Sequence, residues 1–451
     1  MIDRARLAEL LDHERRAFRA RNPLSAAAYE RARAHLFGGV PMTWMNKTAA
    51  GFPLYLAEAR GARVTDLDGH EYVDLCLGDT GAMAGHSPKA TVDAVAERFS
   101  RLGGATVMMP TEDAAWVGAE LGRRFGVPYW SFSLTATDAN RWAIRLARAV
   151  TGRPKILVNS YCYHGSVDEV LLVVGPDGAP VSREGNVGAP VDPTVTGRVV
   201  EFNDLPSLER ELAFGDVAAV LMEPALTNIG IVLPEPGYLD GVRELTRRHG
   251  TLLINDETHT FSAGPGGCTG AWGLDPDIVT IGKAIGGGVP SGGYGLSAEV
   301  AARVEGMSGL DLVDMGGVGG TLAGNALSVA AMRATLEHVL TDDAFAAMSA
   351  LAVRFTDGVQ EVIDRHALPW SVTRLGARAE YRFTSPAPRT GGESNAAGDP
   401  DLDDYLHVYL ANRGVLLTPF HNMALMCPAT TEADIARHHE VFATAVAELT
   451  G

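Results

Sequence analysis

The stretch that decides the fold is DVAAVLMEP (216–224), which is followed by GTLLINDET (250–258) and DIVTIGKAI (277–285). Each segment is a short apolar run that ends in polar or charged residues. Continuous apolar runs of this length are typical of strands that are buried on both faces of a parallel sheet. Because segments with helical patterns lie between them, the chain is predicted to contain an α/β domain with a mostly parallel sheet.

The same alternation of helices and strands extends outward from these runs. Helices are expected over 110–126 and 137–152, and strands over 131–134 and 155–160. A long helix over 323–340 leads out of this domain. The elements that follow predict a smaller α+β domain, with strands over 370–385 and 414–419 and helices over 401–412 and 431–449.

The N-terminal part is expected to be helical over 1–37 and to form a hairpin over 62–75, with Asp68-Gly69 as the turn. The Pro-, Gly- and Ser-rich run at 385–400 is predicted to be a surface loop. We therefore expect three parts: 1–75, an N-terminal segment that packs with the small domain; 76–330, the large α/β domain; and 331–451, the small α+β domain.

The composition is that of an ordinary globular protein, with 46% hydrophobic and 21% charged residues. The net charge of −17 argues against a nucleic acid or an anionic membrane as the main partner. There is no charge-free apolar stretch of about 20 residues, so no membrane-spanning helix is expected. The four cysteines form no CxxC pair, which argues against disulfides and a cysteine-built metal site and favours a cytoplasmic location.

Lys283 directly follows the apolar residues of the third run and is followed by Gly286, Gly287 and Gly288. An isolated lysine in such a position is most often a surface residue whose stem covers apolar groups. A partly desolvated lysine amine is instead a nucleophile that forms an imine with a carbonyl compound. The three glycines would let a flat cofactor approach the backbone closely.

Asp256 ends the second apolar run. By itself, a carboxylate at a strand end can cap a helix or bind a metal ion. Against a pyridine nitrogen, however, a buried carboxylate raises the pKa of that nitrogen and keeps it protonated. A protonated pyridoxal ring accepts electrons from a substrate carbanion, so Asp256 is a candidate for binding the ring nitrogen.

Other polar groups are expected at the same edge of the sheet, where the carboxyl ends of parallel strands meet. Thr135-Ala136-Thr137 opens a predicted helix, and hydroxyls with free backbone N–H groups bind phosphate there. A threonine at this position is also a common N-cap. Tyr163 follows the strand over 155–160, where an aromatic ring can lie flat on a cofactor. Glu223 ends the first run, and Thr321 offers a further hydroxyl.

Together these residues resemble the class III (subgroup II) aminotransferase family of fold-type I pyridoxal-phosphate enzymes. The resemblance extends over about residues 31 to 449. The matching motifs, in chain order, are Gly85-His86-Ser87-Pro88, Thr135-Ala136-Thr137-Asp138-Ala139, Tyr163-His164-Gly165, Glu223-Pro224, Asp256-Glu257-Thr258-His259-Thr260, Ile281-Gly282-Lys283 and Gly320-Thr321. In arrangement the chain is near the glutamate-1-semialdehyde aminomutases and the β-amino-acid and ω-amine aminotransferases.

The resemblance implies that Lys283 binds pyridoxal phosphate as an imine and then moves the substrate proton, while Asp256 holds the ring nitrogen. Thr258 would lie on the ring face opposite Tyr163, where the family more often has valine. The remaining implied cofactor contacts are Thr135, Ala136, Thr137, His164, Glu223 and Thr321 of the partner subunit. A homodimer with the active site at its interface is implied as well, whereas the role of His259 stays open.

The substrate side departs from these relatives, which tend to carry Gly-Gly-Val-Asn-Ser and then an arginine near the start. Here the stretch 38–45 ends in Trp44-Met45 without an arginine, and Phe420 lies near the C-terminus. Because arginine normally clamps a carboxylate, these residues predict a more apolar substrate pocket, with Arg378 or Arg382 left to bind a keto acid. We therefore predict a ping-pong transaminase that moves an amino group from an amine or a β/ω-amino compound to a keto acid or aldehyde.

Three alternatives stay open. The motifs belong to the cofactor, so 2,1-aminomutation of the glutamate-1-semialdehyde type, racemisation or decarboxylation would use the same residues. A nucleotide-binding oxidoreductase is suggested only by the glycines at 286–288 and 292–295, since no GxGxxG motif follows a first strand. A non-catalytic binding protein is disfavoured because both Lys283 and Asp256 are present.

Overall fold

The computed structural model describes residues 2–188, 191–307 and 316–451. Contacts divide the chain into two compact units. The small unit consists of residues 1–87, 346–387 and 397–451, and the large unit of residues 88–345 and 388–396. The boundary predicted after residue 330 falls inside the continuous helix α11 (Ala326–His338), so the large unit extends further along the chain than expected.

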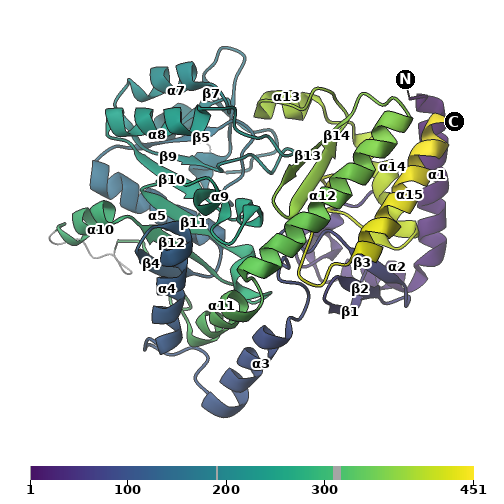
Figure 1. Ribbon diagram of the computed structural model, residues 1–451, viewed down its shortest axis with the longest axis horizontal. Coiled ribbons are helices and arrows are strands. Elements are labelled where there is room, and N and C mark those ends of the chain that lie inside the picture. The colour runs from purple at the N-terminus through teal and green to yellow at the C-terminus, as the bar shows by residue number, and fades with distance from the viewer. Residues whose placement is uncertain (1, 189–190, 308–315) are drawn as a thin grey trace. The chain divides into compact units, whose positions relative to one another are not determined.

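A seven-stranded sheet lies at the centre of the large unit, in the order β4-β12-β11-β10-β9-β5-β8 (Figure 1). Strands β11, β10, β9, β5 and β8 are parallel to one another, whereas β12 runs antiparallel to both of its neighbours. The prediction of a mostly parallel sheet is therefore confirmed. The strands are β4 (Tyr129–Ser133), β5 (Lys155–Asn159), β8 (Gly197–Val200), β9 (Val217–Met222), β10 (Leu252–Asp256), β11 (Ile278–Ile281) and β12 (Gly292–Leu296).

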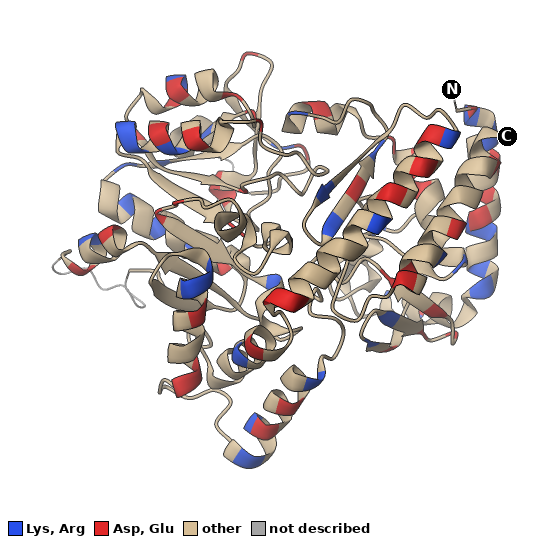
Figure 2. Ribbon diagram, viewed as in Figure 1, with Lys and Arg blue, Asp and Glu red and all other residues tan. Residues whose placement is uncertain are grey.

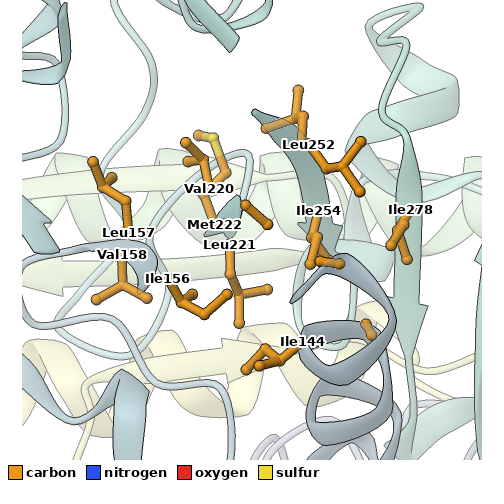
Figure 3. Packing of buried hydrophobic residues seen from close by; sticks show 14 of the residues in the cluster. Ile144, Ile156, Leu157, Val158, Val220, Leu221, Met222, Leu252, Ile254 and Ile278 are labelled. Carbon is orange, nitrogen blue, oxygen red and sulfur yellow. The ribbon is translucent and has the colours of Figure 1, made fainter. Parts of the chain in front are cut away.

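The core of the large unit consists of aliphatic side chains from these strands and from the helix α5 (Ala136–Thr151) (Figure 3). All residues of β9 are buried, as a strand covered on both faces requires. Leu157, Leu221 and Ile254 are fully buried, and each such side chain stabilises the fold by about 2 kcal/mol. Thr135 caps the start of α5, and Gly152 ends the helix in the left-handed conformation that favours glycine.

The remaining elements of the large unit surround this sheet or extend from it. They are α3 (Lys89–Glu97), α4 (Glu112–Phe125), α6 (Pro193–Thr196), α7 (Leu205–Leu212), α8 (Tyr238–His249), α9 (Gly267–Ala271), α10 (Ala298–Glu305), α11, the short helix α13 (Gly391–Ala396) and the two-stranded ribbon of β6 (Leu172–Val174) and β7 (Pro180–Ser182). Helix α13 lies in the stretch 385–400, which was predicted to be a loop throughout.

Strand β12 was not predicted, because its sequence GGYGL is rich in glycine. The structure gives the reason for these glycines: a Cβ atom at Gly295 would lie 2.6 Å from the indole of Trp130 on the neighbouring strand β4. Glycine therefore permits close packing of an aromatic ring on the sheet. Residues 292–295 form a strand and no nucleotide-binding loop, which removes part of the support for the oxidoreductase hypothesis.

The small unit contains two further sheets. The first is formed by β1 (Leu56–Arg60), β2 (Arg63–Asp66), β3 (Glu71–Asp74) and β15 (Val415–Leu416), and the second by β13 (Ser371–Leu375), β14 (Arg378–Arg382) and β16 (Met423–Leu425). The predicted hairpin is confirmed, since β2 and β3 pair in antiparallel orientation and Gly69 has a positive φ in the turn. The helices are α1 (Arg4–Arg21), α2 (Pro23–Ala32), α14 (Pro400–Asn412), α15 (Glu432–Thr450) and most of α12 (Asp342–Arg365).

Within the small unit, the N-terminal residues pack against the C-terminal ones. Helix α1 lies against α14, and the buried carboxylate of Glu14 accepts hydrogen bonds from Asn412 and from both terminal nitrogens of Arg413. The helix expected over 1–37 is interrupted at Asn22-Pro23, because proline lacks the N–H that a helix interior requires.

Charged side chains of both signs are interspersed along the outer helices (Figure 2). Arg248 pairs with Glu244 one turn earlier in α8, and Arg365 pairs with Glu361 in the same way in α12. Such exposed pairs contribute only a few tenths of a kcal/mol each, about 0.3–0.5. All four cysteines are free thiols. In the part of the chain that the structure describes, no helix is both long enough and apolar enough to cross a membrane.

Candidate functional site

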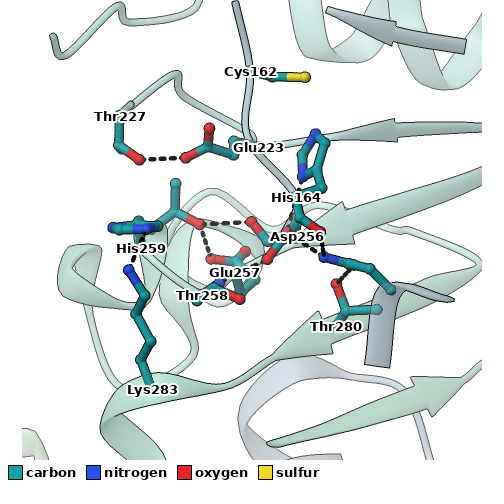
Figure 4. A network of polar contacts seen from close by, with 12 residues as sticks. Cys162, His164, Glu223, Thr227, Asp256, Glu257, Thr258, His259, Thr280 and Lys283 are labelled. Atoms are coloured by element: carbon teal, nitrogen blue, oxygen red, sulfur yellow. Dashed lines mark hydrogen bonds and ion pairs between the residues drawn. The ribbon is translucent and has the colours of Figure 1, made fainter. Parts of the chain in front are cut away.

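The polar residues of the site gather where the parallel strands of the large unit end (Figure 4). Asp256 is the last residue of β10, and Lys283 follows β11 after one glycine. Because β9, β10 and β11 are parallel neighbours, their C-terminal ends lie at the same edge of the sheet. His164 joins this edge from the loop after β5, and Glu223 follows β9.

Asp256 is the centre of a buried hydrogen-bond network and is only 3% exposed. Its Oδ2 atom accepts from Asn140 Nδ2 at 2.8 Å and contacts His164 Nδ1 at 2.9 Å. Its Oδ1 atom accepts from the backbone N–H of Thr258 at 3.0 Å. Asn140 is held in turn by Thr280, whose hydroxyl donates to Asn140 Oδ1 at 2.6 Å. The carboxylate therefore has a defined orientation.

The network keeps Asp256 ionised. Burial raises the pKa of a carboxyl group, but the hydrogen bond and charge of His164, with those from Thr258 and Asn140, outweigh burial and lower the pKa of Asp256. Burial likewise favours a neutral imidazole, but Cys162 and Asp256 together raise the pKa of His164 well above its ordinary value. Both shifts favour an ion pair between His164 and Asp256.

This arrangement fits the ring nitrogen of pyridoxal phosphate. A carboxylate has about four lone-pair positions, and the three donors around Asp256 leave one for a further N–H group. Two other polar atoms at the site, Thr258 Oγ1 and His164 Nε2, are buried without a hydrogen-bond partner among the described residues. Buried polar atoms of this kind are normally satisfied by a bound group or by water.

The start of α5 is built as an anion site. Its first backbone N–H groups, those of Ala136 and Thr137, have no partner within the helix. A Cβ atom at Gly165 would overlap the Thr137 hydroxyl, and one at Gly282 would lie 2.8 Å from the Ala136 nitrogen. Glycine at both positions therefore lets the loops after β5 and β11 approach the helix start closely.

The hydroxyl of Thr135 takes the alternative role considered for it, that of an N-cap. It accepts a hydrogen bond from the Asp138 backbone N–H at 3.1 Å and donates to the Asp138 carboxylate at 3.0 Å. A contact of Thr135 with phosphate stays a prediction, as do those of Ala136 and Thr137.

Lys283 has an unusual backbone conformation, with a φ of 50°. Only a few per cent of residues other than glycine adopt the left-handed region, and such strain is found most often at functional sites. Its amine nitrogen lies 2.9 Å from Nε2 of His259, whose ring is 4% exposed. Figure 4 shows the lysine side chain extending toward the imidazole.

The two glutamates near the site are buried and accept hydrogen bonds from neighbouring groups. Glu223 accepts from the hydroxyl of Thr227, and burial raises the pKa of Glu257. Glu257 accepts from the Thr260 hydroxyl and from the backbone N–H groups at the start of α9. Glu257 therefore anchors α9, whereas contact of Glu223 with the cofactor stays a prediction.

Two predicted cofactor contacts lie on the surface of the single chain. Tyr163 is 42% exposed, and Thr321 is exposed in the turn that precedes α11. Stacking of Tyr163 on the cofactor ring stays a prediction. So does a contact from Thr321 of the partner subunit.

The predicted substrate residues belong to the small unit. Trp44 and Phe420 meet edge to face, with ring centroids 6.4 Å apart. Trp44 and Met45 line a cavity of about 480 Å³ whose other walls are mostly apolar. Arg378 is buried and donates to the hydroxyl of Thr80. Its predicted contact with a substrate carboxylate, and that of Arg382, are not tested by this geometry.

Sequence reasoning missed Asn140. The signal that could have found it is its place in α5, where it lies between the fully buried residues Ala139 and Ala143. A polar side chain on the buried face of a helix requires a hydrogen-bond partner. The partner is Asp256, which lies 116 residues further along the chain.

Comparison with known proteins identifies the family. Residues 44–446 match the family model described as aminotransferase class-III. The chain belongs to the class III aminotransferase family. A glutamate-1-semialdehyde 2,1-aminomutase of Chloroflexus aggregans is 33% identical to it over 425 residues, which are 91% of this chain and 94% of the relative.

Solved structures extend this result. A crystal structure of a glutamate-1-semialdehyde-aminomutase from Pseudomonas aeruginosa in complex with PMP is 49% identical, covers 99% of both chains and has a TM-score of 0.96. An omega-transaminase from Sphaerobacter thermophilus is 30% identical, with a TM-score of 0.85, over 95% of this chain and 98% of that one.

The predicted family, the fold type and the cofactor are therefore confirmed, and this class III aminotransferase is a pyridoxal-phosphate enzyme. For the reaction, the relatives favour the aminomutase alternative over the transaminase that was predicted first.

Proposed function

We propose that the protein catalyses a 2,1-aminomutase reaction, in which an amino group moves between neighbouring carbons of a small amino aldehyde of the glutamate-1-semialdehyde type. The observation that carries this proposal is the 49% identity, over 99% of both chains, with the Pseudomonas aeruginosa protein described as such an enzyme. The buried network around Asp256 supports it, because every reaction of this class needs the same cofactor site.

Pyridoxal phosphate supplies an electron sink that stabilises negative charge on the carbon next to the amino group. Asp256 holds a negative charge at the buried edge of the sheet, where a protonated ring nitrogen is stabilised. Asn140, His164 and the Thr258 backbone keep this carboxylate in place. At the start of α5, Ala136 and Thr137 offer N–H groups to the phosphate.

Lys283 has two roles in this proposal. Its Nζ atom would hold the cofactor through a covalent bond while no substrate is bound. While it is not bonded to the cofactor, the same amine would take a proton from one reacting carbon and give it to another, as a general base and acid. The strained backbone at Lys283 and the hydrogen-bond distance to His259 restrict where this amine lies.

A second candidate function is the transamination of an apolar amine, which the walls of the small-unit cavity favour. Trp44 and Met45 line this cavity with Pro41, Leu54 and Leu417. An apolar wall disfavours a charged carboxylate, because it offers no arginine to pair with the charge. The same wall accommodates an aryl or alkyl group. The two candidates differ in the co-substrate they require.

The experiment uses that difference. The purified holoenzyme is incubated with glutamate 1-semialdehyde alone. The formation of its isomer 5-amino-4-oxopentanoate is followed by liquid chromatography with mass spectrometry, which separates the two compounds of equal mass. In parallel, 1-phenylethylamine and β-phenylalanine are supplied with a keto acid. The proposal expects isomerisation without any keto acid. Amine-dependent consumption of the keto acid, with no isomerisation of the semialdehyde, would establish the second candidate instead.

The variant Lys283→Ala is the control for the assigned lysine, since it is expected to abolish the reaction and the covalent attachment of the cofactor. The homodimer and the cytoplasmic location stay predictions from the sequence. Size-exclusion chromatography with light scattering tests the first, and cell fractionation of the source organism tests the second.

A further inference from the structure

We propose that His259 is a positioning residue for Lys283: its Nε2 atom accepts a hydrogen bond from the lysine Nζ and holds the amine in place whenever it is not bonded to the cofactor. This inference rests on the proposed function in one respect, the assignment of Lys283 as the cofactor-binding lysine. It concerns a step that every reaction of this cofactor shares, so it does not depend on the substrate.

The contact itself is well defined. Nζ of Lys283 and Nε2 of His259 lie 2.9 Å apart, and the imidazole is 4% exposed (Figure 4). A lysine ammonium has three donors and no acceptor, so the imidazole nitrogen that faces it accepts the hydrogen bond. This hydrogen bond requires the tautomer of His259 that carries its proton on Nδ1.

The backbone explains why a second anchor is useful. Lys283 adopts a φ of 50°, and Gly282 before it abuts Ala136 at the start of α5. The Cα position of the lysine is thus strongly restricted. Its side chain, however, has four flexible carbon–carbon bonds, and a contact at the far end is needed to fix the amine.

Each of the neighbouring carboxylates accepts hydrogen bonds from other groups. Asp256 is engaged by Asn140, His164 and the Thr258 backbone, and Glu257 accepts from Thr260 and the start of α9. Glu223 accepts from the Thr227 hydroxyl. His259 brings an acceptor without a negative charge, which holds the amine without stabilising its protonated form as strongly as a carboxylate would.

Proton transfer is a different role, and the magnitudes argue against it. In ordinary surroundings a lysine ammonium holds its proton about 10⁴-fold more tightly than an imidazolium does. A hydrogen bond between the two nitrogens at 2.9 Å requires no such transfer. The geometry supports a positioning role for His259. An amide oxygen at a similar distance from the lysine Nζ is therefore expected to replace the imidazole nitrogen as the acceptor.

The test measures formation of the covalent bond between the cofactor and Lys283. The apoenzyme is mixed with pyridoxal phosphate, and the visible band is followed with time. Samples are quenched with borohydride, and peptide mass spectrometry determines the modified lysine. Cofactor binding before the covalent step is measured separately by the quenching of tryptophan fluorescence.

Three variants of His259 are compared. His259→Leu is expected to slow the covalent step about tenfold, the effect of losing one hydrogen bond. His259→Gln is expected to stay within about threefold of wild type, because its amide oxygen reaches the amine. His259→Asn, with the same amide on a shorter side chain, is expected to be slow. The exposed His338, at the end of α11, gives a matched control, His338→Leu, which is expected to react as wild type does.

A wild-type rate in His259→Leu would overturn the proposal, and so would equal slowing in the Leu and Gln variants. Near-ultraviolet circular dichroism verifies the fold, and if the Leu variant does not fold, the Gln and Asn pair still decides. A protein without aminomutase activity that nevertheless shows this order of rates would contradict the proposed function and support the role of His259.

Discussion

Replacing Asn140 with alanine is expected to destabilise the large unit and to release Asp256. The Asn140 side chain makes three buried hydrogen bonds: to the Asp256 carboxylate at 2.8 Å, to the His164 carbonyl at 3.1 Å and from the Thr280 hydroxyl at 2.6 Å. The bond to the ionised group contributes about 2 kcal/mol, and each neutral bond about 1 kcal/mol. The expected loss in the free energy of unfolding is therefore about 4 kcal/mol.

A second consequence concerns the charge of Asp256. Removal of one of its three donors raises the pKa of this carboxyl group, because a hydrogen bond to the charged form is lost. The carboxylate then has more rotational freedom, so pairing with the cofactor ring weakens. We expect the dissociation constant of pyridoxal phosphate to rise about tenfold, which corresponds to about 1.4 kcal/mol.

Urea unfolding of the apoprotein, followed by tryptophan fluorescence, measures the first effect, and equilibrium titration with pyridoxal phosphate measures the second. Asn395→Ala is the control, since Asn395 is exposed and donates to the Tyr161 hydroxyl at 3.3 Å. It is expected to change stability by less than about 0.5 kcal/mol. A loss below about 1 kcal/mol in Asn140→Ala would refute the argument that this amide holds the network together.

Three further predictions concern other buried groups. Burial holds the pKa of His438 well below 6.5, so the unfolded chain binds this proton more readily than the folded one. Below a pH of about 6.5 this histidine is expected to lower wild-type stability by up to about 1.4 kcal/mol per pH unit, and His438→Phe is expected to reduce the slope in urea titrations by that amount. Thr258→Val removes a buried hydroxyl with no hydrogen-bond partner among the described residues and is expected to stabilise the apoprotein by about 1 kcal/mol in thermal unfolding. Gly165→Ala places a methyl group on the Thr137 hydroxyl and is expected to weaken cofactor binding about tenfold or more, whereas Gly178→Ala, with φ of 81° and no atom within 4 Å, is expected to cost about 1 kcal/mol of stability and leave cofactor binding unchanged.

Each of these expectations has a contrary result. An unchanged pH slope in the His438 variant would show that this imidazole does not govern acid stability. Destabilisation by Thr258→Val would mean that the hydroxyl has a partner in solution. Equal cofactor affinity in the two glycine variants would contradict the close approach of Gly165 to the phosphate-binding helix start.

Much of the large unit could be predicted because its determinants are local. The run 217–222 is apolar throughout, as is typical of a strand covered on both faces. The hairpin around Gly69 follows from a turn residue between two strand patterns. Strand β12 could not be predicted in this way, because the need for glycine at Gly295 comes from the close packing of the Trp130 indole, which lies on another strand.

The residues of the candidate site could likewise be predicted only in part. Lys283 and Asp256 were found because each ends an apolar run, and parallel strands bring such ends together. Asn140 and His164 were not assigned to Asp256, because a hydrogen bond between distant residues leaves no periodic pattern in the chain. The sequence offered two roles for the hydroxyl of Thr135, phosphate binding and helix capping, and the tertiary structure shows the capping contacts with Asp138.

The sequence by itself determined the family, the mostly parallel sheet, the cofactor and the two strand ends that carry Lys283 and Asp256. The tertiary structure alone decided which side chains hold those two residues: Asn140 and His164 for Asp256, and His259 for Lys283. The physical reason is that the position and type of a strand or helix follow from the local pattern of apolar and polar residues. The partner of a buried polar group is chosen by distance and orientation in the folded protein.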